Sequence, residues 1–233
     1  MTNKIDNVVL SPHFDDGIFS LYSILANDKL SRSLITIFSG LPENKKNSLW
    51  DFLCTGKSSV KTMKIRIQEN ENVSNLLGFK TLNLGFLDKQ YKKSNDPADI
   101  KNKILQYIDK SDSVIYAPIA MSSLYRHADH ILIRNIAIDL FSEGFRVIFY
   151  ADIPYMDTSK IITNKIFESL KEKTGNDFTS ETITLSRSSI KNKFNTMRLY
   201  KSQYMMTNLT SLGRLSNTHY FSKEVLFKPT AYN

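Results

Sequence analysis

The sequence has 233 residues, of which 41% are hydrophobic and 23% are charged. These values are typical of a globular protein, and the length suffices for one large domain with a buried core. The formal net charge is +8, but the lysines are spread along the chain and form no basic block or familiar nucleic-acid motif. We therefore attribute the charge to solvated surface lysines and expect no nucleic-acid partner.

The apolar segments and the single cysteine limit the kinds of protein that this sequence can form. The longest apolar runs, 114–121 and 145–153, are far shorter than a membrane span. Residues 1–7 are mostly polar and lead into the first apolar run without the apolar core of a signal peptide. Cys54 is the only cysteine, so an intrachain disulfide is excluded. These features predict a soluble, cytoplasmic protein with no membrane span.

Short runs rich in valine, isoleucine and phenylalanine alternate with stretches of helical period. The expected strands are 7–11, 33–39, 81–86, 112–119, 146–153 and 181–186. The expected helices are 15–28, 60–77, 98–110, 128–143 and 187–206, and the longest expected loops are 41–59 and 88–97. This alternation predicts an α/β protein of three layers with a mostly parallel central sheet. No repeat or Pro/Gly-rich linker interrupts the chain, so we expect one domain over residues 1–233.

The first predicted strand ends in an unusual group of charged side chains. In the run VVLSPHFDDG, His13, Asp15 and Asp16 occupy three of four positions directly after the apolar residues. Charge at the edge of a core is costly unless an ion of opposite sign is held there. A turn followed by a helix cap is the alternative explanation, because aspartate favours the first turn of a helix.

A second group of the same kind follows another predicted strand. In the run YRHADH, residues 125–130, His127, Asp129 and His130 come shortly after the apolar segment VIYAPI. Sites in open α/β sheets form where loops leave the carboxyl ends of strands. Two His/Asp groups, each at such a strand end, therefore indicate a functional site more strongly than either does alone.

If the sheet brings the two groups together, His13, Asp16 and His130 can bind one metal ion. Three nitrogen and oxygen ligands with a position left for water are typical of catalytic Zn²⁺, and Fe²⁺ or Co²⁺ also suits such a set. A metal held there would lower the pKa of its bound water and polarise a substrate carbonyl.

The remaining side chains of the two groups suit acid–base chemistry. Asp15 lies next to a predicted ligand and is the candidate general base for the water. His127 could stabilise an oxyanion or protonate the leaving nitrogen, and Asp129 could orient His127. The sequence has no P-loop, no G-x-S-x-G nucleophile elbow and no G-x-G-x-x-G turn.

These motifs resemble those of the PIG-L/LmbE-like deacetylases, and SPHFDDGIFS is similar to the branch whose first motif begins with Ser-Pro-His. That family comprises zinc-dependent enzymes that remove acetyl groups from N-acetylglucosamine-type sugars on a Rossmann-like fold. HADH resembles its second motif, and weaker similarity covers ITIFSGLP at 35–42, residues 49–78, LGFLDKQY at 84–91, YADIPY at 150–155 and LYKSQ at 199–203. Phe14 and Gly17 stand where the commoner first motif has proline and glutamate.

The resemblance also implies roles for individual residues. It implies zinc ligation by His13, Asp16 and His130, catalysis by Asp15 as base and by His127 tuned by Asp129, and substrate contacts by Arg66 and Asp88. Tyr125, two residues before His127, could reach the tetrahedral intermediate.

We therefore expect a metal-dependent hydrolase that acts on a small N-acetylated amino sugar or a conjugate of one. The alternative is a non-catalytic carbohydrate-binding protein on the same scaffold, with Trp50, Tyr91 and Tyr155 in loops where they could stack on sugars. A nucleic-acid binder would rest on net charge alone, and a steep salt dependence of affinity would reveal it. The sequence leaves the oligomeric state open.

Overall fold

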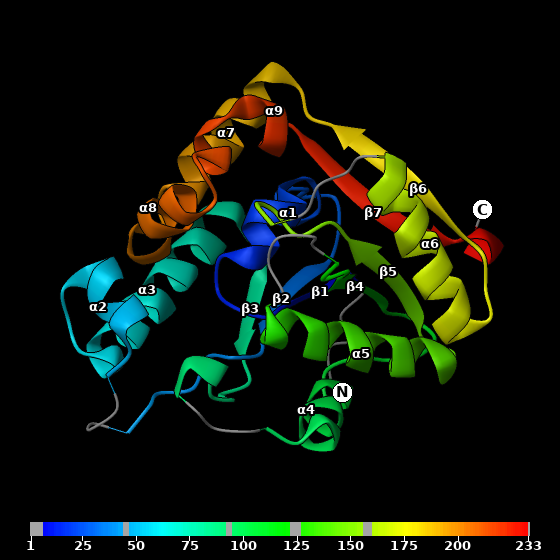
Figure 1. The fold of residues 1–233 in the computed structure, drawn as a ribbon, viewed down its shortest axis with the longest axis horizontal. Coiled ribbons are helices and arrows are strands. Elements are labelled where there is room, and N and C mark those ends of the chain that lie inside the picture. The colour runs from blue at the N-terminus through cyan, green and yellow to red at the C-terminus, as the bar shows by residue number, and fades with distance from the viewer. Residues whose placement is uncertain (1–6, 44–46, 92–94, 122–126, 156–159, 233) are drawn as a thin grey trace.

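The structure is a computed structural model that describes residues 7–43, 47–91, 95–121, 127–155 and 160–232 (Figure 1). In the described ranges the strands are β1 (Asn7–Ser11), β2 (Arg32–Thr36), β3 (Lys80–Asn83), β4 (Val114–Pro118), β5 (Arg146–Tyr150), β6 (Phe178–Thr184) and β7 (Lys223–Pro229). They form one sheet in the order β3-β2-β1-β4-β5-β7-β6. β1 to β5 are parallel, and β7 is antiparallel to both of its neighbours. The predicted α/β class with a mostly parallel sheet is confirmed.

Helices cover both faces of this sheet. They are α1 (Asp16–Leu25), α2 (Leu49–Thr55), α3 (Ser59–Leu77), α4 (Pro97–Leu105), α5 (Ala128–Ser142), α6 (Lys160–Thr174), α7 (Arg187–Met197), α8 (Lys201–Thr210) and α9 (Thr218–Phe221), with 3₁₀ turns at Lys89–Tyr91, Arg214–Ser216 and Thr230–Tyr232. Within the described ranges, none of these helices combines the length and the apolar character needed to cross a membrane.

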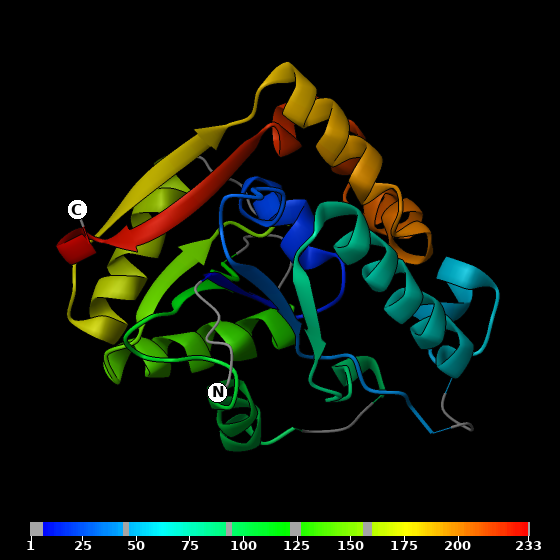
Figure 2. The ribbon, with the colours of Figure 1, turned by 180° about the vertical axis from the view of Figure 1, so that it is seen from behind.

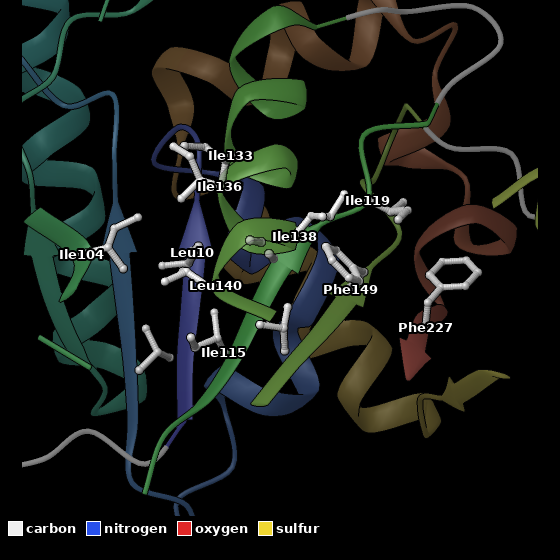
Figure 3. Close-up of a cluster of buried hydrophobic side chains, with 14 of the residues drawn as sticks. Leu10, Ile104, Ile115, Ile119, Ile133, Ile136, Ile138, Leu140, Phe149 and Phe227 are labelled. Carbon is white, nitrogen blue, oxygen red and sulfur yellow. The ribbon is translucent and has the colours of Figure 1, made fainter. Parts of the chain in front are cut away.

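Two hydrophobic cores separate the three layers. Along β1, Val8 and Leu10 belong to the core under α4, α5 and α6, while Val9 belongs to the core under α1, α3 and α7. This alternation follows from the two-residue period of a strand. Figure 3 shows part of the first core, with Leu10 of β1, Ile136 of α5 and Phe149 of β5 among its labelled side chains. Figure 2 shows the helices on the opposite face of the sheet.

One predicted loop contains a helix. Residues 41–59 were expected to lack regular structure, but α2 lies within them. The Oγ atom of Ser48 accepts a hydrogen bond from the backbone N–H of Asp51 at 3.0 Å, which caps the first turn. Gly56, at φ 65°, ends the helix in the left-handed region and donates its N–H to the carbonyl of Phe52 at 2.7 Å. Ser48 and Gly56 are residue types that favour the start and the end of a helix, so the sequence itself indicates both ends of α2.

The single helix predicted over 187–206 is wrong, because the chain forms α7 and α8 there instead. Tyr200 interrupts the helix with φ −80° and ψ 59°. Its ring is fully buried, and its hydroxyl donates to Oδ1 of Asn70 at 3.0 Å. Burying this ring requires the chain to turn, so tertiary packing overrides the helical period.

Two further elements, α6 and β7, were not among the expected ones. β7 lies between β5 and β6, yet its sequence KEVLFKP contains only three consecutive apolar residues. Its Glu224 is nevertheless fully buried. A charged residue inside a strand conceals the apolar pattern on which the prediction of strands depends.

Candidate active site

The two His/Asp groups meet at the carboxyl edge of the sheet. β2 and β4 lie on opposite sides of β1, so the strand order reverses there, and such a point is where ligands bind in open α/β sheets. His13 follows β1, Asp88 follows β3, His127 precedes α5 and Asp152 follows β5. The first three of these residues line a cavity of about 400 Å³.

A tight turn after β1 orients His13 and Asp16. The Oδ2 atom of Asp16 accepts the backbone N–H of His13 at 2.8 Å and lies 3.1 Å from Nδ1 of its ring. The N–H of Gly17 donates to Oγ of Ser11 at 2.9 Å. A Cβ atom on Gly17 would lie 2.4 Å from Cδ1 of Leu34. Because α1 approaches the sheet closely here, a side chain at this position would require Leu34 to shift.

His130, in the first turn of α5, completes the predicted set. Its Nε2 lies 3.3 Å from Oδ2 of Asp16, and its Nδ1 lies 2.7 Å from Oδ1 of Asp152. The second oxygen of Asp152 accepts the backbone N–H of Ala120 at 2.8 Å, which holds the carboxylate in place. Burial lowers the pKa of His130, but the charges of Asp16 and Asp152 outweigh burial and raise this pKa to about 9.

Two imidazole nitrogens at this point are buried and unsatisfied. The Nε2 atoms of His13 and His130 have no hydrogen-bond partner within the described part of the chain. Carboxylate oxygens of Asp88 and Asp129 lie 3.4 Å and 3.5 Å from Nε2 of His13. Buried polar atoms normally have a hydrogen-bond partner. A cation bound by these nitrogen atoms and the neighbouring carboxylate oxygens would supply the missing interaction.

The donor atoms fit a divalent metal ion. Two groups have ligand atoms that all lie within 4.8 Å of one another: His13, His127 and His130, and His13, Asp88 and Asp129. The Oδ2 atom of Asp16 lies near both of the predicted histidine ligands. Imidazole nitrogen and carboxylate oxygen are the ligands that Zn²⁺, Fe²⁺ and Co²⁺ accept. The predicted set is thus brought together, and His127 and two further carboxylates lie beside it.

His127 is the N-cap residue of α5, and its ring centroid lies 4.9 Å from that of His13 and 4.7 Å from that of His130. Burial, together with the charges of these two histidines, lowers the pKa of His127 to about 3. Its buried Nδ1 has no hydrogen-bond partner among the described residues. Asp129 was expected to orient His127, but no hydrogen bond in the described ranges joins them. Asp129 instead accepts the backbone N–H of Lys89 at 3.3 Å.

Asp15 is 5% exposed and lines the cavity beside the predicted ligands. Burial, reinforced by the charge of Asp16, raises its pKa to about 7. The Nε2 atom of Gln203, in α8, donates a hydrogen bond to Oδ1 of Asp15. The Oε1 atom of Gln203 is buried and has no hydrogen-bond partner in the described chain. A side chain from the last third of the sequence therefore holds the candidate base.

Arg66 and Asp88, the predicted substrate contacts, both line the cavity. Arg66 is 4% exposed, and its Nη2 lies 3.0 Å from Oδ1 of Asp51. The hydroxyl of Tyr91 donates to Oδ2 of Asp51 at 2.7 Å, so this buried carboxylate holds both residues. Tyr125 lies outside the described residues.

Sequence reasoning assigned no role to Asp152 or to Gln203. Asp152 lies inside the predicted strand 146–153, whereas β5 ends at Tyr150, so the predicted bounds concealed its place after a strand end. Gln203 lies in α8 and ends the segment LYKSQ, which resembles the family, but neither its residue type nor its spacing indicates a role. Of the three aromatic residues expected to face a sugar, Trp50 and Tyr155 line the cavity. The third, Tyr91, is buried behind it.

Comparison with known proteins identifies relatives of this arrangement. The family model described as PIG-L, GlcNAc-PI de-N-acetylase, matches residues 8–141. A 2'-N-acetylparomamine deacetylase from Niallia circulans is 24% identical over 181 aligned positions, and the match covers 63% of this chain and 66% of that protein. The match thus spans just under two thirds of the length of this curated relative.

Solved structures share the fold over nearly the whole chain. The zinc-inhibited form of teicoplanin deacetylase superposes with a TM-score of 0.69 at 17% identity, covering 96% of this chain and 97% of that one. The deacetylase of the A40926 pseudoaglycone gives 0.68 at 19% identity and covers 99% of both chains. N,N'-diacetylchitobiose deacetylase from Pyrococcus horikoshii gives 0.61 at 16% identity, covering 97% of this chain and 84% of that one. At these identities the likeness establishes the shared fold.

Proposed function

Because this chain belongs to the PIG-L family, GlcNAc-PI de-N-acetylase, we propose that it is a metal-dependent amide hydrolase. Its substrate is a small amino sugar of the N-acetylglucosamine type, or a conjugate of one, from which it removes the N-acetyl group. The observation that carries this proposal is the contact of Asp16 with both His13 and His130, beside a cavity that His13, Asp16 and the buried carboxylate of Asp15 line. The curated relative is named for deacetylation of an amino sugar, which supports the same reaction.

His13, Asp16 and His130 would hold the metal in this proposal, and Zn²⁺ is the first candidate. This ligand set is supported by the Oδ2 atom of Asp16, which lies 3.1 Å from Nδ1 of His13 and 3.3 Å from the buried Nε2 of His130, unpartnered within the described residues. When bound, a divalent cation supplies Lewis acidity, which lowers the pKa of a water molecule and polarises an amide carbonyl. Fe²⁺ or Co²⁺ would supply the same chemistry to this donor set.

Asp15 is the proposed general base, and Gln203 positions it. Asp15 takes a proton from the attacking water and returns it to the leaving amine, since the low pKa of His127 leaves that imidazole without a spare proton. The carboxamide of Gln203 holds one oxygen of Asp15, which leaves the other oxygen to accept that proton. The arrangement is supported by the burial of both side chains in the wall of one cavity.

His127 is the proposed electrophilic partner. Its ring lies against the rings of His13 and His130, and its buried Nδ1 has no partner in the described chain. A hydrogen bond from this ring to the oxygen of the tetrahedral intermediate would stabilise the developing charge. We propose that Asp129 tunes this group through the charge that it places in the site.

Arg66, Asp88 and Tyr125 are the proposed substrate contacts. Two of them line the cavity, together with the aromatic side chains of Trp50 and Tyr155, on which a sugar ring could stack. The role of Tyr125 rests on its place in the sequence, two residues before His127. We further propose that residues 1–233 act as one domain, in the cytoplasm and without a nucleic-acid partner.

The test of this function is a paired measurement on the purified protein. Metal content is determined, and amine release from a panel of N-acetylglucosamine derivatives is followed before and after chelation. We expect about one equivalent of metal and amine release that chelation abolishes and Zn²⁺ restores. A metal-free protein that binds these sugars without releasing amine would instead be a carbohydrate-binding protein on the same scaffold.

Replacing Asp152 with alanine is expected to weaken metal binding by about 10–100-fold, the usual effect of removing a carboxylate behind a histidine ligand. The physical reason is that Nδ1 of His130 loses the acceptor that fixes its ring. The metal dissociation constant, measured by competition with a chelating dye, checks this. Asp177→Ala, which alters an exposed aspartate, is the matched control. Equal affinities in the two variants would contradict the prediction.

A further inference from the structure

The exposed apolar side chains of this protein are gathered on one region. Nine large hydrophobic side chains are exposed in the described ranges, and six of them come from α2, from α8 or from the residues just after α8. These six are Leu49, Phe52, Leu53, Met205, Leu209 and Leu212. Single exposed apolar residues are ordinary, but a gathered group marks an interaction site. We refer to these six side chains as the α2/α8 surface.

In both helices of this surface, polar residues are buried and large apolar residues are exposed. A helix on a globular protein normally turns its apolar side toward the core. In α2 the buried residue is Asp51, while Phe52 is 60% exposed. In α8 the buried residues are polar, whereas Met205 and Leu209 are 63% and 67% exposed.

The candidate active site explains only the inward sides of these helices. Gln203 and Thr207 of α8 line the cavity, and Asp51 of α2 holds Arg66. The apolar outward sides take no part in these contacts and need a separate explanation. α2 and α8 pack against one another, and Figures 1 and 2 show them as neighbours at one end of the molecule.

Exposed cations accompany the apolar side chains. Residues 49–60 and 198–212 carry three exposed cations, Lys57, Arg198 and Lys201. The only acidic residue in these two ranges is Asp51, which is buried against Arg66. Lys57 lines the same surface hollow as Leu49 and Phe52. Lys201 precedes Met205 by four residues, which places both on one side of α8.

We propose that the α2/α8 surface docks onto an anionic lipid bilayer. Apolar side chains enter the boundary between headgroups and acyl chains, and the surrounding cations attract anionic headgroups. A second copy of the chain fits less well, because a two-fold interface over this surface would gather cations from both copies, and residues 49–60 and 198–212 hold no exposed acid to pair them. Docking would place one wall of the cavity, formed by Trp50, Thr207 and Thr210, close to the bilayer.

The test is sedimentation of the full chain with vesicles of phosphatidylcholine alone, or of equal parts phosphatidylcholine and phosphatidylglycerol. We expect binding to the anionic vesicles, weaker binding to the neutral ones, and weakening by salt. Phe52→Ser combined with Leu209→Ser should reduce the partition coefficient at least about tenfold, because two apolar side chains no longer enter the bilayer. Lys57→Gln combined with Lys201→Gln should reduce it about thirtyfold on anionic vesicles only.

Leu76→Ser is the matched control, because Leu76 is 62% exposed at the end of α3, outside the α2/α8 surface. Its partition coefficient should equal that of the unaltered protein, and thermal unfolding verifies that all variants fold. The proposal is overturned if the unaltered protein ignores anionic vesicles or binds neutral ones equally. It is also overturned if light scattering shows a dimer that Phe52→Ser with Leu209→Ser dissociates. Vesicle binding needs no turnover, so its failure leaves the proposed hydrolase untouched.

Discussion

Replacing Asp15 with asparagine is expected to lower kcat by about 10²–10⁴-fold, the range for loss of a group that transfers protons. Asparagine keeps the shape of the side chain and can still accept the hydrogen bond from Gln203, but it cannot take a proton from water. His13, Asp16 and His130 are unchanged, so the protein should keep its metal. Steady-state amine release and metal content, measured on the same preparation, check both parts.

Asp28→Asn is the matched control for this prediction, because Asp28 is an exposed aspartate after α1. It should leave kcat unchanged. A near-normal kcat for Asp15→Asn would refute the role of Asp15 as base. Loss of the metal together with activity would instead assign Asp15 to the structure of the metal site, and the two measurements separate these outcomes.

Replacing Lys193 with methionine is expected to lower the free energy of unfolding by about 3–5 kcal/mol, the usual cost of breaking a buried ion pair. Lys193 in α7 is fully buried, and its Nζ donates to Oε1 of Glu224 at 2.7 Å. Burial lowers the pKa of Lys193, and the carboxylate of Glu224 opposes this shift. Without the lysine, Glu224 would keep its contacts with Ser23 but remain a buried charge without a cation.

Urea denaturation followed by circular dichroism measures this loss. Lys191→Met, at an exposed position of the same helix, should change the free energy of unfolding by no more than about 0.5 kcal/mol. Adding Glu224→Gln to Lys193→Met should recover part of the loss, because no buried charge remains. Equal stability of Lys193→Met and Lys191→Met would show that the pair does not stabilise the junction of α7, β7 and α1.

The sequence predicts those contacts of the candidate site that are made between residues close together in the chain. His13 and Asp16 are three residues apart, and their contact is made within one turn after a strand. His127 and His130 are likewise separated by three residues at the start of one helix. Parallel strands place their carboxyl ends along one edge, so the meeting of the two groups follows from the predicted sheet.

The contacts that hold the site residues in place could not be predicted from the sequence. Asp152 lies 22 residues from His130, and Gln203 lies 188 residues from Asp15. No periodicity or spacing joins such partners, because only the packing of α8 over the cavity brings the carboxamide to the carboxylate. The break at Tyr200 and the burial of Glu224 in β7 have the same origin. Tyr200 bonds to Asn70 and Glu224 to Lys193, and both partners are distant in the sequence.

By itself, the sequence determined the α/β class, the strand ends that carry the histidines and aspartates, and the types of ligand atom available to a metal. These follow from the two-residue and 3.6-residue periods and from the chemistry of single side chains, which neighbours in the chain establish. Only the tertiary structure decided which side chains hold Asp15 and His130, and that the apolar sides of α2 and α8 face outward. Those outcomes depend on how the helices pack on the sheet and on which buried polar groups need a hydrogen-bond partner. Both bring together residues that are distant in the sequence.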